Sequence, residues 1–222
     1  MEDNFDFELI GSEGQQPEVP PEQAPQQEAK PAKKKLTPAQ QFFKDTRDVI
    51  VIVTTFMLVY VLFFRAVVVV GDSMYDTLMD GDYLLVLNNL IYKDPKQGDI
   101  IVASKDSFRG GEPIIKRVIA VEGQTVDIDF QNAIVYVDGE ALNEPYIGSP
   151  TVDPEGVAFP LTVDAGCIFV LGDNRENSQD SRYPEIGLID TRQVLGKAIF
   201  LFFPGNDFGN SPRDFGRLGG VG

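Results

Sequence analysis

A serine and a lysine at separate points of the chain could together form a hydrolytic site. Ser73 lies shortly after a run of valines and two residues beyond Gly71, and Lys116 lies within a run of aliphatic residues. The 222-residue sequence contains no histidine, which excludes a Ser-His-Asp triad and any metal site built on imidazole. Lysine is the known alternative base for a serine nucleophile. Ser73 and Lys116 are therefore the candidate catalytic pair, with Lys116 as general base.

A lysine acts as a base only in its uncharged form, which places a demand on its surroundings. Its pKa must fall from about 10.4 toward 7, equivalent to roughly 4 to 5 kcal/mol in favour of the neutral amine. Burial of an ammonium group supplies shifts of this size, and aliphatic neighbours such as Ile115 and Val118 indicate a dry position for Lys116. Arg117 would add repulsion if its side chain pointed the same way. A solvated strand lysine is the alternative.

Residues 172–182 are unusually polar, with the sequence GDNRENSQDSR. Within them, Ser178 could orient the amine of Lys116 through a hydrogen bond, the role that an aspartate has in the triad. Ion pairs in and beside this segment would stiffen the site without reacting, and we expect two: Asp180 with Arg182, and Asp173 with Arg117. A solvated polar turn is the alternative.

The turn that carries Ser73 would supply the other parts of a hydrolytic site. A developing oxyanion needs hydrogen-bond donors; the Ser73 backbone N–H is a candidate, and Gly71 contributes main chain without a side chain. Met74 and Leu78 would form apolar walls beside the nucleophile. The acidic residues in 80–82 indicate a turn rather than a metal site, so no metal or cofactor is expected.

Residues 37–65 predict a membrane-spanning helix with an N-terminal extension. Thr37, Pro38 and Gln40 fit the N-cap, the first helical position and the capping-box partner of a helix start. The stretch 49–64 carries no charged residue and comes close to the length needed to cross a bilayer. A buried helix of a soluble domain and a cleaved signal peptide are the alternatives.

The sequence on either side of this helix predicts its orientation. Residues 1–36 are rich in Gln, Pro and Glu and predict a disordered tail. Basic residues gather before the span, whereas Arg65 alone follows it directly, so the positive-inside rule places the N-terminus in the cytoplasm and the remaining chain beyond the membrane. The basic residues before the span are Lys30, Lys33, Lys34, Lys35, Lys44 and Arg47.

Residues 66–204 predict a mainly β catalytic domain, a coiled antiparallel sheet or barrel. Short β-branched runs separated by glycine-containing turns indicate the strands, which we expect at 67–70, 83–87, 99–103, 113–119, 125–128, 133–137, 167–171 and 196–201. The glycine-rich residues 205–222 predict a flexible C-terminal tail, with Phe208 and Phe215 as anchors.

Composition limits the partners and the chemistry. The net charge of −15 argues against a nucleic-acid partner, which would call for a basic face. Cys167 is the only cysteine, so no disulfide can form within the chain. We expect Cys167 to be a small buried strand residue rather than a nucleophile, because no histidine is present to activate it.

Four segments, in this order and behind an N-terminal anchor, resemble the motifs of bacterial type I signal peptidases: 71–78, 97–102, 115–120 and 172–182. The resemblance covers about residues 48–204 and is closest to the smaller, Gram-positive-like enzymes. It implies that Ser73 is the nucleophile, Lys116 the general base and Ser178 the group that holds the lysine. It also implies that a shallow pocket accepts the substrate residue before the cut, lined by Val69, Val70, Met74, Leu78 and Ile115.

Asp76 departs from the family pattern, in which a proline usually stands at this position. Aspartate can hold a similar turn through its side chain. Its charge, if close to Lys116, would favour the ammonium form and oppose catalysis.

The function that the resemblance implies is removal of N-terminal signal peptides from secreted precursors by a membrane-anchored serine endopeptidase. The catalytic domain would lie at the outer face of the cytoplasmic membrane, in contact with lipid, and precursors would carry small residues at the first and third positions before the cut. The alternatives are a dedicated peptidase for a single pilus or conjugation precursor, and an inactive anchored β-domain that binds precursors. A self-cleaving repressor would share the dyad, but it should carry a DNA-binding domain and no anchor.

Overall fold

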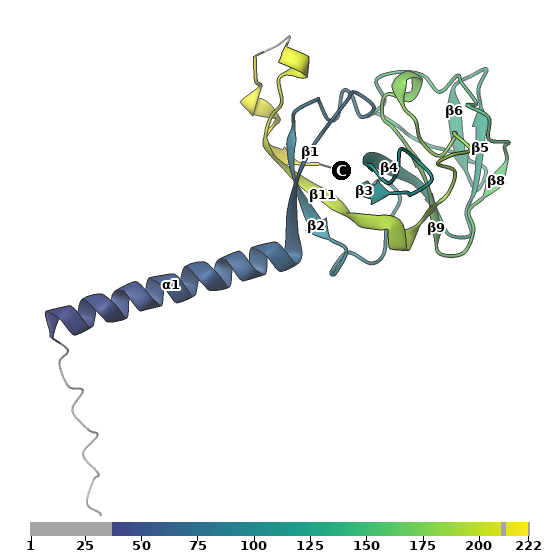
Figure 1. Ribbon diagram of the computed structural model, residues 1–222. Coiled ribbons are helices and arrows are strands. Elements are labelled where there is room, and N and C mark those ends of the chain that lie inside the picture. Colours follow the sequence, from purple (N-terminus) through teal and green to yellow (C-terminus); the bar gives the residue numbers. More distant parts are fainter. Residues whose placement is uncertain (1–36, 210–211, 222) are drawn as a thin grey trace, which may run out of the picture. The chain divides into compact units, whose positions relative to one another are not determined.

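The computed structural model describes residues 37–209 and 212–221 (Figure 1). The predicted disordered tail, 1–36, and its basic cluster at 30–35 lie outside the described residues. The described chain contains one long helix followed by a domain of antiparallel strands, which matches the predicted fold class.

Helix α1 spans Pro38–Phe63 and is capped as predicted. The Gln40 backbone N–H donates to Thr37 Oγ1 at 3.4 Å, and the Thr37 N–H donates to Gln40 Oε1 at 3.0 Å, which is a capping box. With 26 residues the helix is about 39 Å long. Its most apolar window has a mean hydropathy of 1.9 and none of its residues is buried. The helix is therefore long and apolar enough to cross a membrane.

The helix ends two residues before the predicted boundary, because Phe64 and Arg65 already belong to strand β1 (Phe64–Val68). Strand β1 pairs with β2 (Tyr83–Asn88), Arg65 lying opposite Val86. In this pairing the backbone groups of β1 hydrogen-bond to the neighbouring strand, whereas in a continuing helix they would bond only within the helix. Val69 and Val70, predicted as strand, lie beyond the end of β1 and enter the turn that carries Ser73.

Two antiparallel sheets make up the β-domain (Figure 1). The larger has the order β1-β2-β11-β3-β4-β9-β10, with β12 paired to β11, and the smaller has the order β7-β6-β5-β8. The remaining strands of the larger sheet are β3 (Ile100–Ser104), β4 (Pro113–Val121), β9 (Cys167–Leu171), β10 (Ile189–Asp190), β11 (Val194–Phe203) and β12 (Gly219–Gly220). Those of the smaller sheet are β5 (Thr125–Asp129), β6 (Ile134–Val137), β7 (Glu140–Ala141) and β8 (Leu161–Thr162).

Short 3-10 helices occur in the connections: Arg175–Asn177, Thr191–Gln193, Asp207–Gly209 and Phe215–Arg217. In the part of the chain that the structure describes, three groups of buried side chains form the core. One lies beneath the turn that carries Ser73 and contains Met74, Leu78 and Val86. Another joins the two sheets, with Val126 from β5 packed in the same cluster as Phe169 from β9.

Two sequence-based expectations for this domain differ from the structure. Cys167 is half-buried at the start of β9 rather than fully buried. The described part of 205–222, predicted to be flexible, forms β12 and pairs with β11, Phe200 lying opposite Gly220. Phe215 packs edge-to-face against Phe203, as expected of an anchor, although Phe215 and Phe208 are both exposed.

Candidate active site

Ser73 and Lys116 meet, although 43 positions separate them in the sequence. Ser73 lies in the turn between β1 and β2, and Lys116 lies in β4. The Lys116 Nζ atom is 2.7 Å from Ser73 Oγ and donates a second hydrogen bond to the Ile115 carbonyl at 3.0 Å. This contact is short enough for direct proton transfer between the two side chains.

We call residues 69–82 the nucleophile loop, and its two ends are tied together. The Val69 N–H donates to the Asp82 carbonyl at 2.8 Å, and the Gly81 N–H donates to the Val69 carbonyl at 2.9 Å. Met74 and Leu78 are fully buried in the core below. Because both ends and the apolar side chains are fixed, the hydroxyl of Ser73 has a defined position.

Burial makes Lys116 a weak base by ordinary standards. The residue is 4 % exposed, and this burial is the main cause of a pKa lowered to about 8. The Arg109 guanidinium contributes to the lowering, while Asp180, Asp173 and Asp72 act in the opposite direction. The expected repulsion from Arg117 is not the one found: Arg109 supplies the neighbouring positive charge, and Arg117 forms a pair with Asp173.

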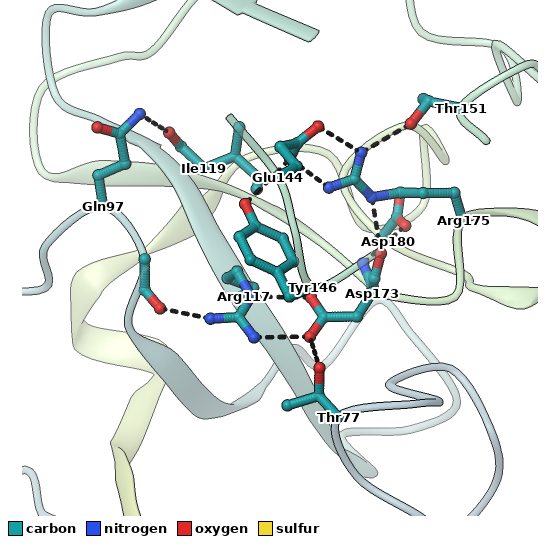
Figure 2. Close-up of polar contacts among 12 residues, drawn as sticks. Thr77, Gln97, Arg117, Ile119, Glu144, Tyr146, Thr151, Asp173, Arg175 and Asp180 are labelled. Carbon is teal, nitrogen blue, oxygen red and sulfur yellow. Dashed lines mark hydrogen bonds and ion pairs between the residues drawn. The ribbon is translucent and has the colours of Figure 1, made fainter. Parts of the chain in front are cut away.

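The Arg117 guanidinium is held on several sides, as Figure 2 shows. It donates two hydrogen bonds to the Asp173 carboxylate, at 2.8 and 2.7 Å, and a third to the Gly98 carbonyl at 2.9 Å. The Tyr146 ring lies 3.9 Å from the guanidinium carbon. The Thr77 hydroxyl also donates to Asp173, at 2.6 Å. The predicted Asp173–Arg117 pair is thus present, and it ties the nucleophile loop to β4.

The second predicted pair is also present. Arg182 donates to both oxygens of Asp180, at 2.9 and 3.0 Å, with both side chains fully buried. Asp180 additionally accepts from the Gly172 N–H at 3.1 Å. These bonds fix the backbone of residues 172–182, which passes beside Ser73: the Asn174 N–H donates to the Ser73 carbonyl at 3.1 Å.

Arg175 was not singled out from the sequence, yet it is fully buried. It donates to Glu144 at 2.5 Å and to the Thr151 hydroxyl at 2.7 Å (Figure 2). Its position in the Gly-Asp-Asn-Arg run was the available signal. The partners lie 31 and 24 positions away, so no local pattern could have identified them.

Ser178 is placed beside the dyad without the predicted hydrogen bond. Its Oγ atom is buried and has no hydrogen-bond partner among the described residues. A Cβ atom on Gly172 would lie 2.2 Å from this Oγ and 2.5 Å from the Ser73 carbonyl. A glycine at 172 therefore allows Ser178 and Ser73 to approach each other closely, and the Ser178 hydroxyl remains uncommitted.

The two backbone groups expected to stabilise the oxyanion, those of Gly71 and Ser73, differ in their hydrogen bonding. The Gly71 N–H donates to Asp80 Oδ1 at 2.9 Å and is thus already used. No hydrogen bond from the Ser73 N–H occurs among the described residues.

Asp80 and Asp82 stabilise the turn through backbone N–H groups, Asp82 accepting from Met79 at 2.8 Å. Residues 37–209 and 212–221 contain no cluster of three or more metal-ligating side chains.

A groove of about 600 Å³ contains Ser73, Lys116 and Ser178. Of the expected pocket residues, four line it: Val69, Val70, Met74 and Ile115. The prediction for Leu78 is wrong, because its side chain is fully buried in the core and does not reach the groove.

Asp76 is not among the main groups that shift the pKa of Lys116, in contrast to the concern raised by the sequence. Its side chain is exposed and lies near Gly148. The carboxylates that raise the pKa of Lys116 most are Asp180, Asp173 and Asp72.

Two unpaired strand edges border this groove. Strand β4 pairs with β3 from Pro113 onward but with β9 only from Arg117 onward. Among the described strands, β1 pairs with β2 alone. Residues 113–116 and 67–70 both line the groove, so a polypeptide lying there would have backbone groups available for hydrogen bonding.

The chain is similar in sequence to known proteins over most of its length. Residues 43–203 match the model of a family described as signal peptidase, peptidase S26. Signal peptidase I of Bacillus licheniformis is 34 % identical over 173 residues, which covers 74 % of this chain and 90 % of the relative. Signal peptidase I T of Bacillus subtilis is 33 % identical over 186 residues, covering 80 % and 92 %. The probable signal peptidase I-1 of Synechocystis is 40 % identical over 146 residues, covering 63 % and 71 %. A signal peptidase I structure from Enterococcus faecalis gives a TM-score of 0.40 at 33 % identity, covering 47 % of this chain and 97 % of that one.

Proposed function

The chain belongs to the signal peptidase family, peptidase S26, and we propose that it removes signal peptides from secreted precursors with Ser73 as nucleophile and Lys116 as general base. The observation that carries the proposal is the 2.7 Å contact between Lys116 Nζ and Ser73 Oγ, made by a buried amine whose pKa is lowered to about 8. Serine endopeptidase activity is that of the family, and we assign the catalytic dyad to Ser73 and Lys116.

The reaction follows from this contact. Neutral Lys116 accepts the hydroxyl proton of Ser73 while Oγ attacks the carbonyl carbon of the scissile bond. The Ser73 N–H donates to the developing oxyanion. Lys116, now an ammonium, gives its proton to the leaving amine, and the C–N bond breaks to leave an acyl-enzyme. Water then attacks the ester, Lys116 accepts a proton from it, and Ser73 regains a hydrogen as the signal peptide leaves.

Ser178 has a place in this cycle. Each time Lys116 accepts a proton it becomes an ammonium at a stage when Ser73 Oγ is bonded to the substrate carbon. The Ser178 hydroxyl is buried, unpartnered and part of the same groove, and an unpartnered acceptor beside a forming cation stabilises it. We therefore assign to Ser178 the holding of the protonated lysine.

The protonation equilibrium sets the cost of catalysis. With a pKa of about 8, about one molecule in ten carries the neutral amine at pH 7, a cost of about 1.4 kcal/mol. At the ordinary lysine pKa the cost would be about 5 kcal/mol. Burial thus accounts for most of this reduction in the cost of deprotonating Lys116, and Arg109 adds to it.

The precursor would lie in the groove as an extended strand. The free edges of 113–116 and 67–70 can hydrogen-bond its main chain, and alternate side chains would point into the wall. Val69, Met74 and Ile115 leave a shallow apolar surface near Ser73. We infer that this surface selects small residues at the first and third positions before the cut.

Helix α1 would anchor the enzyme in the lipid of the cytoplasmic membrane. The positive charges that precede the apolar stretch support a cytoplasmic N-terminus under the positive-inside rule. The catalytic domain would then lie at the outer face of the cytoplasmic membrane.

Cleavage of a radiolabelled secretory precursor tests the function. The purified full chain in detergent should release the signal peptide, Ser73→Ala should not, and Ser107→Ala, an exposed serine outside the dyad, should match the wild type. Cleavage by Ser73→Ala would refute the nucleophile, and precursor binding without cleavage by the wild type would favour an inactive binding domain. A panel of unrelated precursors separates a general enzyme from one dedicated to a single pilus or conjugation substrate.

A further inference from the structure

The segment that follows β11 lies outside the part of the chain that matches the family, which ends at residue 203. It returns to the β-domain, drawn in yellow in Figure 1. Strand β12 pairs with β11, and Val221 packs on the core cluster that contains Met74 and Leu78 of the nucleophile loop. This segment, residues 204–209 and 212–221, therefore shares a core with the residues that seat Ser73.

We propose that the C-terminal segment is a positioning element for the nucleophile, with Arg217 as its decisive residue. The proposal rests on the proposed function, since it concerns the same catalytic loop. Arg217 does not touch the dyad; it acts through the far end of the nucleophile loop, at Thr77 and Asp82.

The segment first meets the loop at Gly205. The Gly205 N–H donates to Asp82 Oδ1 at 2.6 Å. A Cβ atom on Gly205 would lie 2.0 Å from the Asp80 carbonyl oxygen and 2.8 Å from the Asp82 nitrogen. Backbone thus packs directly on backbone here, which only glycine allows.

Arg217 makes the second contact, a bidentate pair with Asp82. Its Nη1 and Nη2 atoms donate to the Asp82 carboxylate at 3.0 and 2.7 Å, and Nη2 also donates to the Thr77 carbonyl at 3.3 Å. Asp82 is fully buried and also accepts from the Met79 N–H. One buried carboxylate therefore joins the loop to both contact points of the segment, and Arg217 supplies its neutralising charge.

Thr77 connects this clamp to the catalytic lysine. Its carbonyl accepts from Arg217. Its hydroxyl donates to Asp173, which pairs with Arg117 (Figure 2). Arg117 is the residue next to Lys116. The loop is thus held from one side by the C-terminal segment and from the other by β4. Because small misplacements of reacting groups cost large factors in rate, loss of Arg217 should loosen the Ser73–Lys116 contact.

The test compares Arg217→Gln, Arg217→Lys and the double variant Asp82→Asn/Arg217→Gln with wild type, all as the full chain in detergent. Arg213→Gln is the matched control, because Arg213 lies in the same segment, contacts Phe203 and the Pro204 carbonyl, and makes no hydrogen bond to the nucleophile loop among the described residues. We expect Arg217→Gln to lower kcat about ten-fold with little change in KM. Arg217→Lys should recover part of the loss, and Arg213→Gln should behave as wild type. The acid limb of the pH profile should stay in place, because Arg217 is not among the main groups that shift Lys116.

The double variant keeps the test decisive if Arg217→Gln alone fails to fold, because it removes the orphaned carboxylate together with its partner. It should fold and still show the reduced kcat; a wild-type kcat in a folded double variant would overturn the proposal. Hydrogen exchange of the peptide covering residues 69–82 gives a readout independent of cleavage. Exchange should accelerate there in the Arg217 variants and not in Arg213→Gln. If the wild type cleaves no precursor, the proposed function fails while exchange still decides the clamp, and unchanged exchange refutes the clamp alone.

Discussion

Raising the pH from 6 to 8 should increase kcat/KM for precursor cleavage by about fifty-fold. The prediction follows from the pKa of about 8 for Lys116: the neutral fraction is about 1 % at pH 6, about 9 % at pH 7 and about 50 % at pH 8. The sign is fixed by the role of the amine, since a general base works only when deprotonated. An ordinary lysine would instead give a limb near pH 10.

Two variants should move this limb in opposite directions. Arg109→Gln removes a cation that lowers the pKa of Lys116, so the limb shifts to higher pH and activity at pH 7 falls. Asp72→Asn removes a carboxylate that raises the same pKa, so the limb shifts to lower pH. Glu140→Gln, on β7 of the smaller sheet, is the control and should leave the limb in place.

Initial rates at low precursor concentration, measured across the pH range for each protein, give kcat/KM and hence the pKa of the free enzyme. A limb near pH 10 in the wild type would refute the buried-base account. Shifts of the same sign in Arg109→Gln and Asp72→Asn would refute the electrostatic reasoning even if the wild-type limb were as predicted.

Three further variants test the packing and charge of the site. Lys116→Met should raise the free energy of unfolding at pH 7 by up to about 3 kcal/mol. The lowered pKa of the buried lysine destabilises the folded state, and this penalty is full below pH 8 and vanishes above about 10.5. Denaturant titrations at pH 7 and pH 10.5 should therefore show a smaller gain at the higher pH, and an equal gain at both would contradict the prediction. Asp173→Asn should lower stability by about 3 to 5 kcal/mol, because it leaves the guanidinium of Arg117 buried without a counter-charge, and an unchanged thermal midpoint would count against it. Asp76→Asn should leave the pH–rate limb where it is, because that carboxylate is exposed and not among the main groups that shift Lys116.

Features encoded by neighbouring residues could be predicted from the sequence. The capping box of α1 needs only Thr37 and Gln40, three positions apart. The strands with several β-branched residues in a row were placed to within a few residues. The dyad could be inferred because histidine is absent and the motifs around Ser73 and Lys116 occur in a recognisable order.

Features that depend on distant partners could not. Leu78 looks like a pocket residue beside the nucleophile, but the loop turns it into the core. Arg217 and Asp82 lie 135 positions apart, and the glycine-rich stretch between β11 and β12 suggested only Phe208 and Phe215 as anchors, not Arg217. Strands of two residues, such as β10 and β12, are too short to show a pattern. The cation that acts on Lys116 is Arg109 rather than its neighbour Arg117, because side-chain pairing decides which charge remains available.

The central claim is that an uncharged Lys116 takes the proton of Ser73, and replacing that amine tests it most directly. Precursor cleavage by Lys116→Met should be absent at every pH between about 6 and 9, in a protein at least as stable as the wild type, while Lys93→Met, at an exposed lysine, should retain full activity and the same acid limb. Cleavage by Lys116→Met that still rises with pH along the wild-type limb would show that another group is the base and would contradict the account.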